Sequence, residues 1–172
     1  VKSKYTGMII SYWELMESAL WGKPVDMNDT KTPFGIAYWI TKGATEGFTG
    51  LDPVGFPAGR AGISSTNYPR WANWSAPYNA ITKEDLVRKM RTASRKTRFR
   101  SPVSHAVPDL STGNGIYTTN DVIGLLEEVL EGQNMNLGND IASKDGRVLF
   151  HSTPIIYAPY LDEDSSNPVY MI

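Results

Sequence analysis

The 172-residue chain contains no cysteine and only two histidines. The lack of cysteine excludes disulfide scaffolds, zinc–thiolate sites and thiol catalysis. Apolar runs are only a few residues long, whereas a membrane-spanning helix needs about 20. The formal net charge is only −1, which argues against binding nucleic acid over the whole surface. What is present, 41% hydrophobic and 11% aromatic residues, is enough for the core of one ordinary domain.

The small net charge hides a strong separation along the chain. Residues 83–100 carry eight Lys or Arg against two acids, a net +6. Residues 101–172 carry two Lys or Arg against ten acids, a net −8, and residues 1–82 are nearly neutral at seven against six. Copies placed head-to-tail would set the basic segment against the acidic half, so this distribution favours self-association.

The N-terminal part of the chain has the apolar spacing of a helix over residues 8–21. Four apolar residues fall on one face at helical intervals: Ile9, Trp13, Met16 and Leu20. We expect Gly22 to end this helix in the left-handed conformation, and Pro24 to prevent its resumption. The chain opens on Val1 and closes on an unfinished apolar run, so we expect it to be part of a longer protein.

A second helix is expected over residues 82–98. Thr82 is a suitable N-cap, and Asp85, three residues later, adds an acid where the helix dipole favours one. The helix has one narrow apolar stripe, and the rest of its surface is mostly Arg and Lys. Six cations are candidates for contact with another subunit or with phosphate: Arg88, Arg91, Arg95, Lys96, Arg98 and Arg100. The simpler interpretation is a solvated helix surface.

A third helix is expected over about residues 120–131, capped by Thr119 or Asn120 and ended by Gly132. Acids occupy its last turn, which the helix dipole disfavours, so we expect a cation from a neighbour there. The tail then predicts three short strands separated by polar turns, over residues 148–150, 154–159 and 169–172.

Residues 33–80 mix glycine and proline with nine large aromatic residues. This composition predicts a long extended loop or loose hairpin, with residues 34–40 as its best strand. So long a loop cannot easily bury its aromatic residues alone, so we expect several of them at a subunit interface: Trp39, Phe48, Phe56, Trp71 and Trp74.

Catalytic motifs are scarce. Neither His105 nor His151 lies near a nucleophile or metal motif, and His151 is better interpreted as a locally bonded residue at a strand end. The sequence 113–115, Gly-Asn-Gly, is only a fragment of a dinucleotide fingerprint and indicates a turn. The formal glycosylation sequon at Asn73 has no support from a secretion signal.

The turn before the last strand contains four oxygen-bearing residues that could bind a hard cation: Asp162, Glu163, Asp164 and Asn167. They lack the spacing of a calcium loop, so a solvated turn is the better interpretation. We therefore expect no catalytic residue, no cofactor site and no metal site, and no enzymatic activity.

Several segments together resemble the major capsid proteins of tailed bacteriophages and prophages. They are Leu20-Trp-Gly-Lys-Pro24, Thr32-Pro-Phe-Gly-Ile-Ala-Tyr-Trp39, Trp71-Ala-Asn-Trp74, Ile81-Thr-Lys-Glu-Asp-Leu86 with the basic helix after it, and the tail from Val148 to Leu161. The resemblance covers most of the chain, although each motif alone is short.

The resemblance implies an α+β fold of the Hong Kong 97 type. The basic helix 82–98 would be its spine helix, and the helix at 120–131 with the tail strands would belong to its axial domain. Residues 33–80 would be the extended region that reaches a neighbouring subunit. Residues 1–80 would accordingly form a helix plus extended region, and residues 81–172 the spine helix and the axial-domain-like region.

The function implied by the resemblance is a structural coat protein that self-assembles into an icosahedral shell around DNA. Its partners would be copies of itself in pentamers and hexamers, with packaged DNA, a scaffold or a portal as further partners, and no membrane. Its location would be the virion, and the bacterial cytoplasm during assembly.

Three other functions remain open. A nucleic-acid-binding module would use the basic helix 83–100 with interleaved aromatic residues. A carbohydrate-binding or hydrolytic domain would use Trp39, Trp71 and Trp74 with the carboxylates of Asp162 and Asp164. An encapsulin-like compartment shell would use the same self-association as a capsid.

Overall fold

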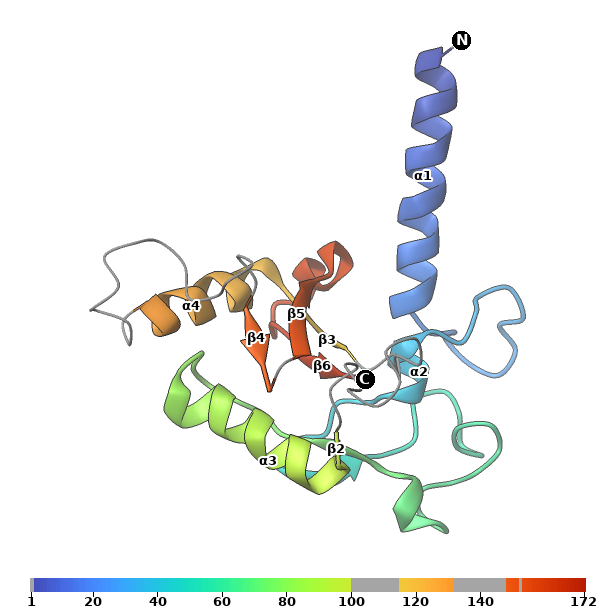
Figure 1. Ribbon diagram of the computed structural model, residues 1–172. Helices are drawn as coiled ribbons and strands as arrows, with labels where there is room; N and C mark the ends of the chain where they lie inside the picture. The colour runs from blue at the N-terminus through green and yellow to red at the C-terminus, as the bar shows by residue number, and fades with distance from the viewer. Residues whose placement is uncertain (1, 100–114, 132–147, 152) are drawn as a thin grey trace, which may run out of the picture. The chain divides into compact units, whose positions relative to one another are not determined.

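The computed structural model describes residues 2–99, 115–131, 148–151 and 153–172 (Figure 1). It combines helices with β-sheet, so the predicted α+β class is confirmed. The chain forms two compact units, residues 1–77 (unit 1) and residues 78–172 (unit 2). The boundary lies three residues before the division after residue 80 expected from the sequence. Among the described residues, no helix is long and apolar enough to cross a membrane.

Unit 1 begins with helix α1, Lys2–Trp21, which runs as one straight element in Figure 1. It starts earlier than residue 8 and ends where expected, as the N–H of Gly22 donates to the Ser18 carbonyl at 2.9 Å. The prediction of a left-handed Gly22 is wrong, because Gly22 is not among the residues of positive φ. The four apolar residues that the sequence places on one face of this helix are all exposed.

The strand expected over residues 34–40 is instead a single helical turn, α2, Ile36–Trp39. The ring of Tyr38 in this turn packs against that of Phe34, which precedes the turn, with centroids 4.5 Å apart. Tyr38 also packs edge-on against Phe56 at 4.9 Å, and both Tyr38 and Phe56 are buried. This aromatic packing outweighs the β propensity of the segment.

The remainder of unit 1 contains one antiparallel pair of short strands, within the segment predicted to be an extended loop or loose hairpin. Strand β1, Gly47–Gly50, pairs with β2, Asn73–Ser75, with an irregularity in the register. The chain between them runs through tight turns and a 3-10 turn, Pro69–Trp71. Glycines make these turns possible: Gly55, Gly59 and Gly62 have positive φ values of 92°, 83° and 78°.

Unit 2 contains a four-stranded sheet in the order β4-β5-β3-β6. Its strands are β3, Ile116–Thr118, β4, Leu149–Phe150, β5, Thr153–Tyr157, and β6, Tyr170–Met171. Strand β3 is parallel to β5 and antiparallel to β6, and β4 is antiparallel to β5. The three tail strands are thus confirmed with shorter lengths, β5 beginning one residue earlier than expected, whereas β3 was not predicted. A 3-10 turn, Pro159–Glu163, follows β5.

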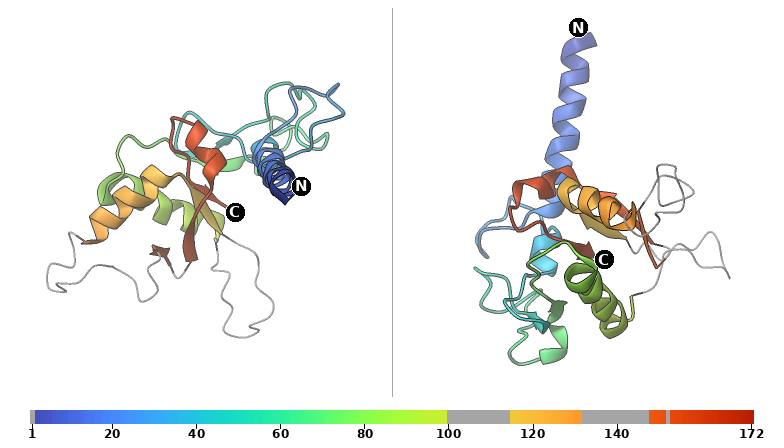
Figure 2. Two further views of the ribbon diagram at one scale, coloured as in Figure 1. Left: turned by 90° about the horizontal axis from the view of Figure 1, so that it is seen from above. Right: turned by 90° about the vertical axis from the view of Figure 1, so that its left-hand side faces the viewer.

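Two helices complete unit 2, as the views in Figure 2 show. The predicted helix at 82–98 is confirmed, with a π-helical first turn, Lys83–Val87, before α3, Arg88–Thr97. The helix at 120–131 is confirmed as α4, Asn120–Glu131. Both helices and the sheet share one core, whose buried members are Leu86, Met90, Ile116, Val122, Leu126, Val148, Phe150 and Ile155.

Candidate functional site

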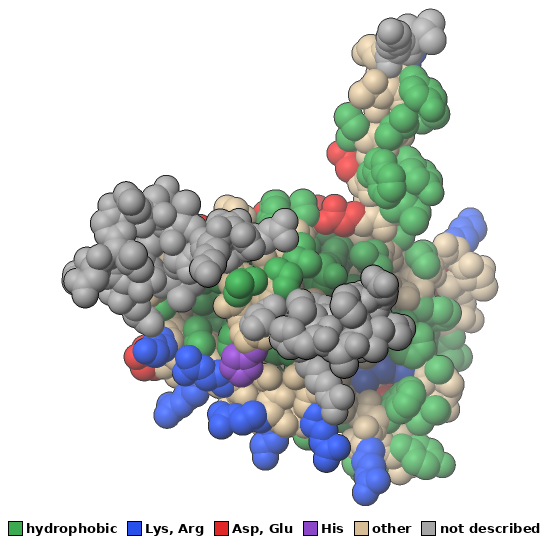
Figure 3. Space-filling view, in the orientation of Figure 1, with side chains coloured by type: hydrophobic (Ala, Val, Ile, Leu, Met, Phe, Trp, Pro, Cys, Tyr) green, Lys and Arg blue, Asp and Glu red, His purple; other side chains and the backbone are tan. Residues whose placement is uncertain are grey.

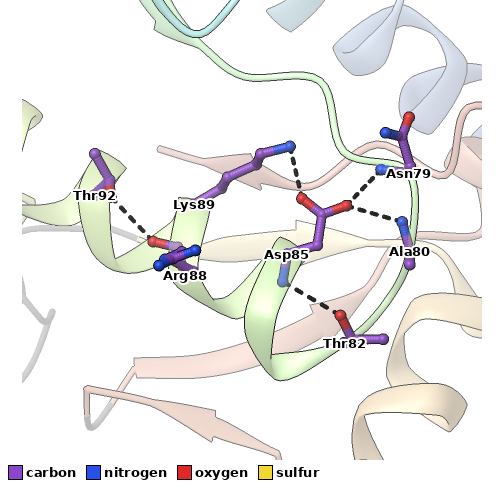
Figure 4. A network of polar contacts seen from close by, with 7 residues as sticks. All are labelled: Asn79, Ala80, Thr82, Asp85, Arg88, Lys89 and Thr92. Carbon is purple, nitrogen blue, oxygen red and sulfur yellow. Dashed lines mark hydrogen bonds and ion pairs between the residues drawn. The ribbon is translucent and has the colours of Figure 1, made fainter.

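Helix α3 starts from a network of hydrogen bonds around Asp85 (Figure 4). The Asp85 N–H donates to Thr82 Oγ1 at 3.3 Å, which confirms Thr82 as the N-cap. The Asp85 carboxylate accepts from the N–H groups of Asn79 and Ala80 at 2.7 and 3.0 Å, and pairs with Lys89 Nζ at 2.6 Å. The hydrogen bond from Lys89, followed by those from Asn79 and Ala80, lowers the pKa of Asp85 to about 2.

The inner side of this helical segment fits the core of unit 2. Leu86, Met90 and Ala93 are buried at 3%, 4% and 7% exposure, so these three members of the apolar stripe expected from the sequence are confirmed, whereas its last member, Thr97, is exposed. Beyond the last turn, Arg98 takes the left-handed conformation with φ of 55°, and the Phe99 N–H donates to the Ser94 carbonyl at 3.0 Å. This closure satisfies carbonyls that the end of the helix would otherwise leave unpaired.

The outer side of α3 is a basic face, which we define as Arg88, Arg91, Arg95, Lys96 and Arg98. All five side chains are exposed. Figure 3 shows Lys and Arg side chains gathered along the edge that α3 forms. Within the part of the chain that the structure describes, none of the five forms an ion pair; Arg95 Nε bonds only to the Arg91 carbonyl, at 3.2 Å. Arg100, the sixth expected cation, lies outside the described residues.

Helix α4 presents charge of the opposite sign. Its inner side is fixed by Val122 and Leu126, at 0% and 5% exposure. Its outer side is an acidic face, which we define as Asp121, Glu127 and Glu128, all exposed. The last turn of α4 contains no basic residue. The acids near its C-terminus therefore oppose the helix dipole with no compensating cation on the helix itself.

The start of α4 accounts for one of the carboxylates considered as a cation ligand. Asp162 Oδ1 accepts from the Asn120 N–H at 3.0 Å, and Oδ2 accepts from the Tyr157 hydroxyl at 2.7 Å. Thr119 Oγ1 accepts from the Val122 N–H at 3.4 Å, so Thr119 caps the helix. Asp162 therefore supports the beginning of α4 from the turn after β5.

Two other residues of that turn, Asp164 and Asn167, also form local hydrogen bonds. Asp164 accepts from the backbone and the hydroxyl of Ser166, at 3.0 and 2.6 Å. Asn167 Oδ1 accepts from the Thr119 hydroxyl at 3.3 Å, and Glu163 is exposed. No group of three or more His, Asp or Glu residues with the geometry of a metal site occurs among the described residues. Asp162, Asp164 and Asn167 are thus engaged in hydrogen bonds within unit 2, as the interpretation of a polar surface turn expects.

The expected interface aromatics are only partly available for contact. Trp39, Phe48 and Trp71 are 45%, 53% and 41% exposed. Trp74 lies in β2 and is half-buried. Phe56, expected at an interface, is instead only 7% exposed. It belongs to the aromatic cluster within unit 1, because the α2 turn brings Tyr38 against it.

Unit 1 depends on a buried arginine that the sequence analysis did not identify. Arg60, at 3% exposure, donates to the carbonyls of Gly50, Leu51 and Trp71 and to the side chains of Thr41 and Asn73, over 2.7–3.0 Å. Burial lowers the pKa of the Arg60 guanidinium, and the charge of Asp52 partly opposes that effect. In the sequence, Arg60 is distinguished only as a charged residue between Gly59 and Gly62 in a loop with few charges.

Asn73, the residue of the formal sequon, is the second member of this polar core. Its side-chain oxygen accepts from the Thr41 N–H at 3.1 Å and from Arg60, and its amide nitrogen donates to the Thr41 carbonyl at 2.8 Å. These hydrogen bonds hold Thr41 and Asn73, which lie 32 residues apart in the chain, against one another. The side chain is therefore engaged in structure rather than presented for modification.

His151 is exposed, with φ of 49°, and its ring stacks on Phe150 with centroids 4.3 Å apart. This agrees with its interpretation as a locally engaged residue at a strand end. His105, Gly113 and Asn114 lie outside the described residues. Gly115 exchanges backbone hydrogen bonds with Ile172 at 2.7 and 2.9 Å, which extends the pairing of β3 with β6.

Among the described residues, unit 2 thus presents a basic face on α3 and an acidic face on α4, and unit 1 contains an aromatic loop with a polar centre. Comparison with known proteins adds no relative: no protein-family model, curated protein or solved structure matches this chain.

Proposed function

We propose that this chain is a structural subunit that assembles with copies of itself into an icosahedral capsid shell. The fold proposed with it is the Hong Kong 97 type implied by the resemblance to phage major capsid proteins. The observation that carries the proposal is the apolar surface of α1, which unit 1 leaves uncovered.

Helix α1 exposes nine large apolar side chains, with exposed fractions from 39% for Ile9 to 67% for Leu15. At 100° per residue, eight of them fall within one arc of roughly 160°: Tyr5, Met8, Ile9, Tyr12, Trp13, Leu15, Met16 and Leu20. The opposite side contains polar residues such as Ser11, Glu14 and Ser18. Figure 3 shows apolar side chains along the length of this helix.

The area of this arc is larger than isolated proteins usually expose. Its three aromatic residues alone, each between 55% and 65% exposed, present on the order of 300–400 Å². The largest apolar patch on a typical monomer is roughly 300–600 Å² in total. Five aliphatic residues add to the aromatic area. We therefore expect another protein surface to cover α1 when the chain is assembled.

A coat protein supplies that burial through its subunit contacts. Each copy in a shell meets several neighbours through different patches, so the protein needs extended apolar and charged surfaces rather than one cavity. The exposed side chains of Trp39, Phe48 and Trp71 add to the surface available in unit 1. An enzymatic role is not part of this proposal.

Electron microscopy combined with sedimentation analysis tests the proposal. The protein is examined over a range of concentration and salt, and rings or closed shells are expected above a threshold concentration. Well-behaved monomers under all of these conditions would overturn it.

A second candidate function is nucleic-acid binding, which the basic face of α3 favours. Five exposed cations on one short helix would neutralise phosphates, and binding would weaken steeply with salt. Titration of a fluorescent oligonucleotide at two salt concentrations tests it. Binding that is strong at low salt and lost with a steep salt slope supports this candidate, and weak binding at low salt excludes it.

A further inference from the structure

The basic face of α3 and the acidic face of α4 have no partner of opposite charge among the described residues. We propose that they bind each other between two copies of the chain, the basic face of one copy docking on the acidic face of the next. This inference rests on the proposed shell function and names one of its subunit contacts.

The first step of the argument is that the two faces cannot satisfy each other within one copy. Met90 of α3 and Leu126 of α4 are both buried in the shared core of unit 2. On an α-helix, a residue about half a circumference away from the buried stripe points out of the core. The basic face and the acidic face lie on these outward sides, so both are directed away from the core that the helices share.

The second step is that the charges match in spacing. Arg88 and Arg95 are seven residues apart on α3, and Asp121 and Glu128 are seven residues apart on α4. Both spacings are two helical turns and correspond to a rise of about 10 Å. Arg88 and Arg95 lie nearly opposite the buried stripe of α3. On α4, Asp121 and Glu128 lie roughly 120–140° around the helix from the midpoint of Val122 and Leu126. Two outward-facing rows with the same interval can therefore lie against one another.

The third step is that each face lacks compensation within its own helix. Arg88, Arg91 and Arg95 stand on the outer side of α3 with no acid among residues 88–97. Glu127 and Glu128 stand in the C-terminal half of α4, where a cation is favoured. A basic partner would offset this unfavourable placement. Lys89, the remaining cation of α3, is engaged with Asp85.

The geometry of such a contact suits a ring or shell. It joins two different patches, so it is heterologous and leaves one basic and one acidic face free on a pair of copies. Successive copies can then add in the same way until a ring closes. Exposed ion pairs each contribute little free energy, so the contact is expected to act mainly on the rate and register of assembly.

The test reverses each face separately. In one variant Arg88→Glu, Arg91→Glu and Arg95→Glu are combined, which takes the net charge of the basic face from +5 to −1. In another Glu127→Lys is combined with Glu128→Lys, which takes the acidic face from −3 to +1. The new acids at positions 88 and 91 lie toward the N-terminal half of α3 and the new bases in the C-terminal half of α4, where the helix dipoles favour them. The fold is therefore expected to persist, which circular dichroism checks. A control variant combines Lys83→Glu with Glu163→Lys, two exposed residues outside both faces.

Assembly is followed by light scattering and electron microscopy. Each reversal alone sets like charges together and is expected to slow assembly roughly tenfold or more, whereas the control assembles as the original chain does. In an equimolar mixture of the two reversed chains, opposite charges meet wherever the two chains alternate, which a ring with an even number of copies allows and a pentamer does not, so partial recovery of assembly is expected. A chain that carries both reversals is expected to recover it as well.

Other outcomes overturn the inference in distinguishable ways. If both reversed chains assemble at the original rate, the contact is wrong and the shell function stands. If neither the mixture nor the doubly reversed chain recovers, the faces have another partner. Loss of oligonucleotide binding on reversal of the basic face, with normal assembly on reversal of the acidic face, assigns the basic face to nucleic acid. An original chain that remains monomeric overturns the contact together with the proposed function.

Discussion

The guanidinium group of Arg60 donates to the side-chain oxygen of Asn73 at 2.8 Å, across 13 positions of the chain. Asn73 in turn bonds both the N–H and the carbonyl of Thr41. Three distant points of a Gly- and Pro-rich loop are thereby held together by polar contacts. This buried polar centre and the small aromatic cluster together provide the buried contacts of a segment with little regular structure.

Replacement of Arg60 by methionine is expected to destabilise unit 1 by about 3 kcal/mol, because the carbonyls of Gly50, Leu51 and Trp71 lose a buried charged donor. All five tryptophans lie in unit 1, so urea unfolding followed by tryptophan fluorescence reports on this unit. The matched control is Arg70→Met at an exposed arginine, with an expected change within about 0.5 kcal/mol. Equal effects of the two replacements would show that Arg60 is not the centre of the loop.

The tight turns of the same loop depend on Gly59, which has φ of 83°. A Cβ at Gly59 would collide with the carbonyl group of Ile63 and the Cα of Ser64, whereas a Cβ at Gly62, with φ of 78°, would meet nothing within 4 Å. Gly62→Ala is therefore expected to cost only the left-handed strain of about 1 kcal/mol, and Gly59→Ala clearly more. Tryptophan fluorescence during urea unfolding compares them. A larger cost at Gly62 would contradict the close approach of residues 59 and 63.

The sequence was informative where structure is decided locally. The cap at Thr82, the apolar stripe of α3 and the end of α1 at Gly22 follow from signals within a few residues. Strand β3 could not be found in this way, because Ile116–Thr118 is stabilised by pairing with β5 and β6, whose residues lie about 40 to 55 positions later. Propensity in a segment of three residues carries too little information to reveal such pairing.

The same distinction applies to the candidate site. The clusters of opposite charge are visible in the sequence, and helical periodicity places them on the outer sides of α3 and α4. The exposure of α1 could not be predicted, because an amphipathic pattern shows that a face can be buried and does not show by what. The roles of Arg60 and Phe56 were missed for a related reason, since their partners are brought near by loop geometry rather than by spacing.

The low pKa of Asp85 predicts a loss of stability in acid. A carboxylate whose pKa is about 2 in the folded chain, against 3.8 ordinarily, stabilises the fold at pH values above its ordinary pKa. That contribution declines as the pH falls from about 4 to about 2, because protonation removes the hydrogen bonds from Lys89, Asn79 and Ala80. The protection factors of amides in residues 79–90, which are corrected for the slower intrinsic hydrogen exchange in acid, are therefore expected to fall over this interval.

The Asp85→Asn variant provides the comparison for that measurement. It has no carboxylate to protonate at this position, so its protection factors are expected to be lower than those of the original chain at pH 6 and to change little between pH 4 and pH 2. Glu84→Gln, at the exposed neighbouring position, is the matched control and should keep the original profile. An unchanged acid response in Asp85→Asn would mean that other carboxylates govern this segment.

Two adjacent leucines of α4 give the sharpest test of how unit 2 is packed. Leu126 is 5% exposed and lies in the core with Val122 and Ile116, whereas Leu125 is 41% exposed. Leu126→Ala is expected to cost about 2–5 kcal/mol, because it removes buried methyl groups and leaves a cavity. Leu125→Ala should cost less than about 1 kcal/mol, since alanine is a good helix former and little burial is lost.

Hydrogen exchange of the α4 amides measures both costs, as unit 2 contains no tryptophan. Because the two residues point about 100° apart on the helix, equal costs would mean that α4 is rotated from its position on the sheet, and the acidic face with it.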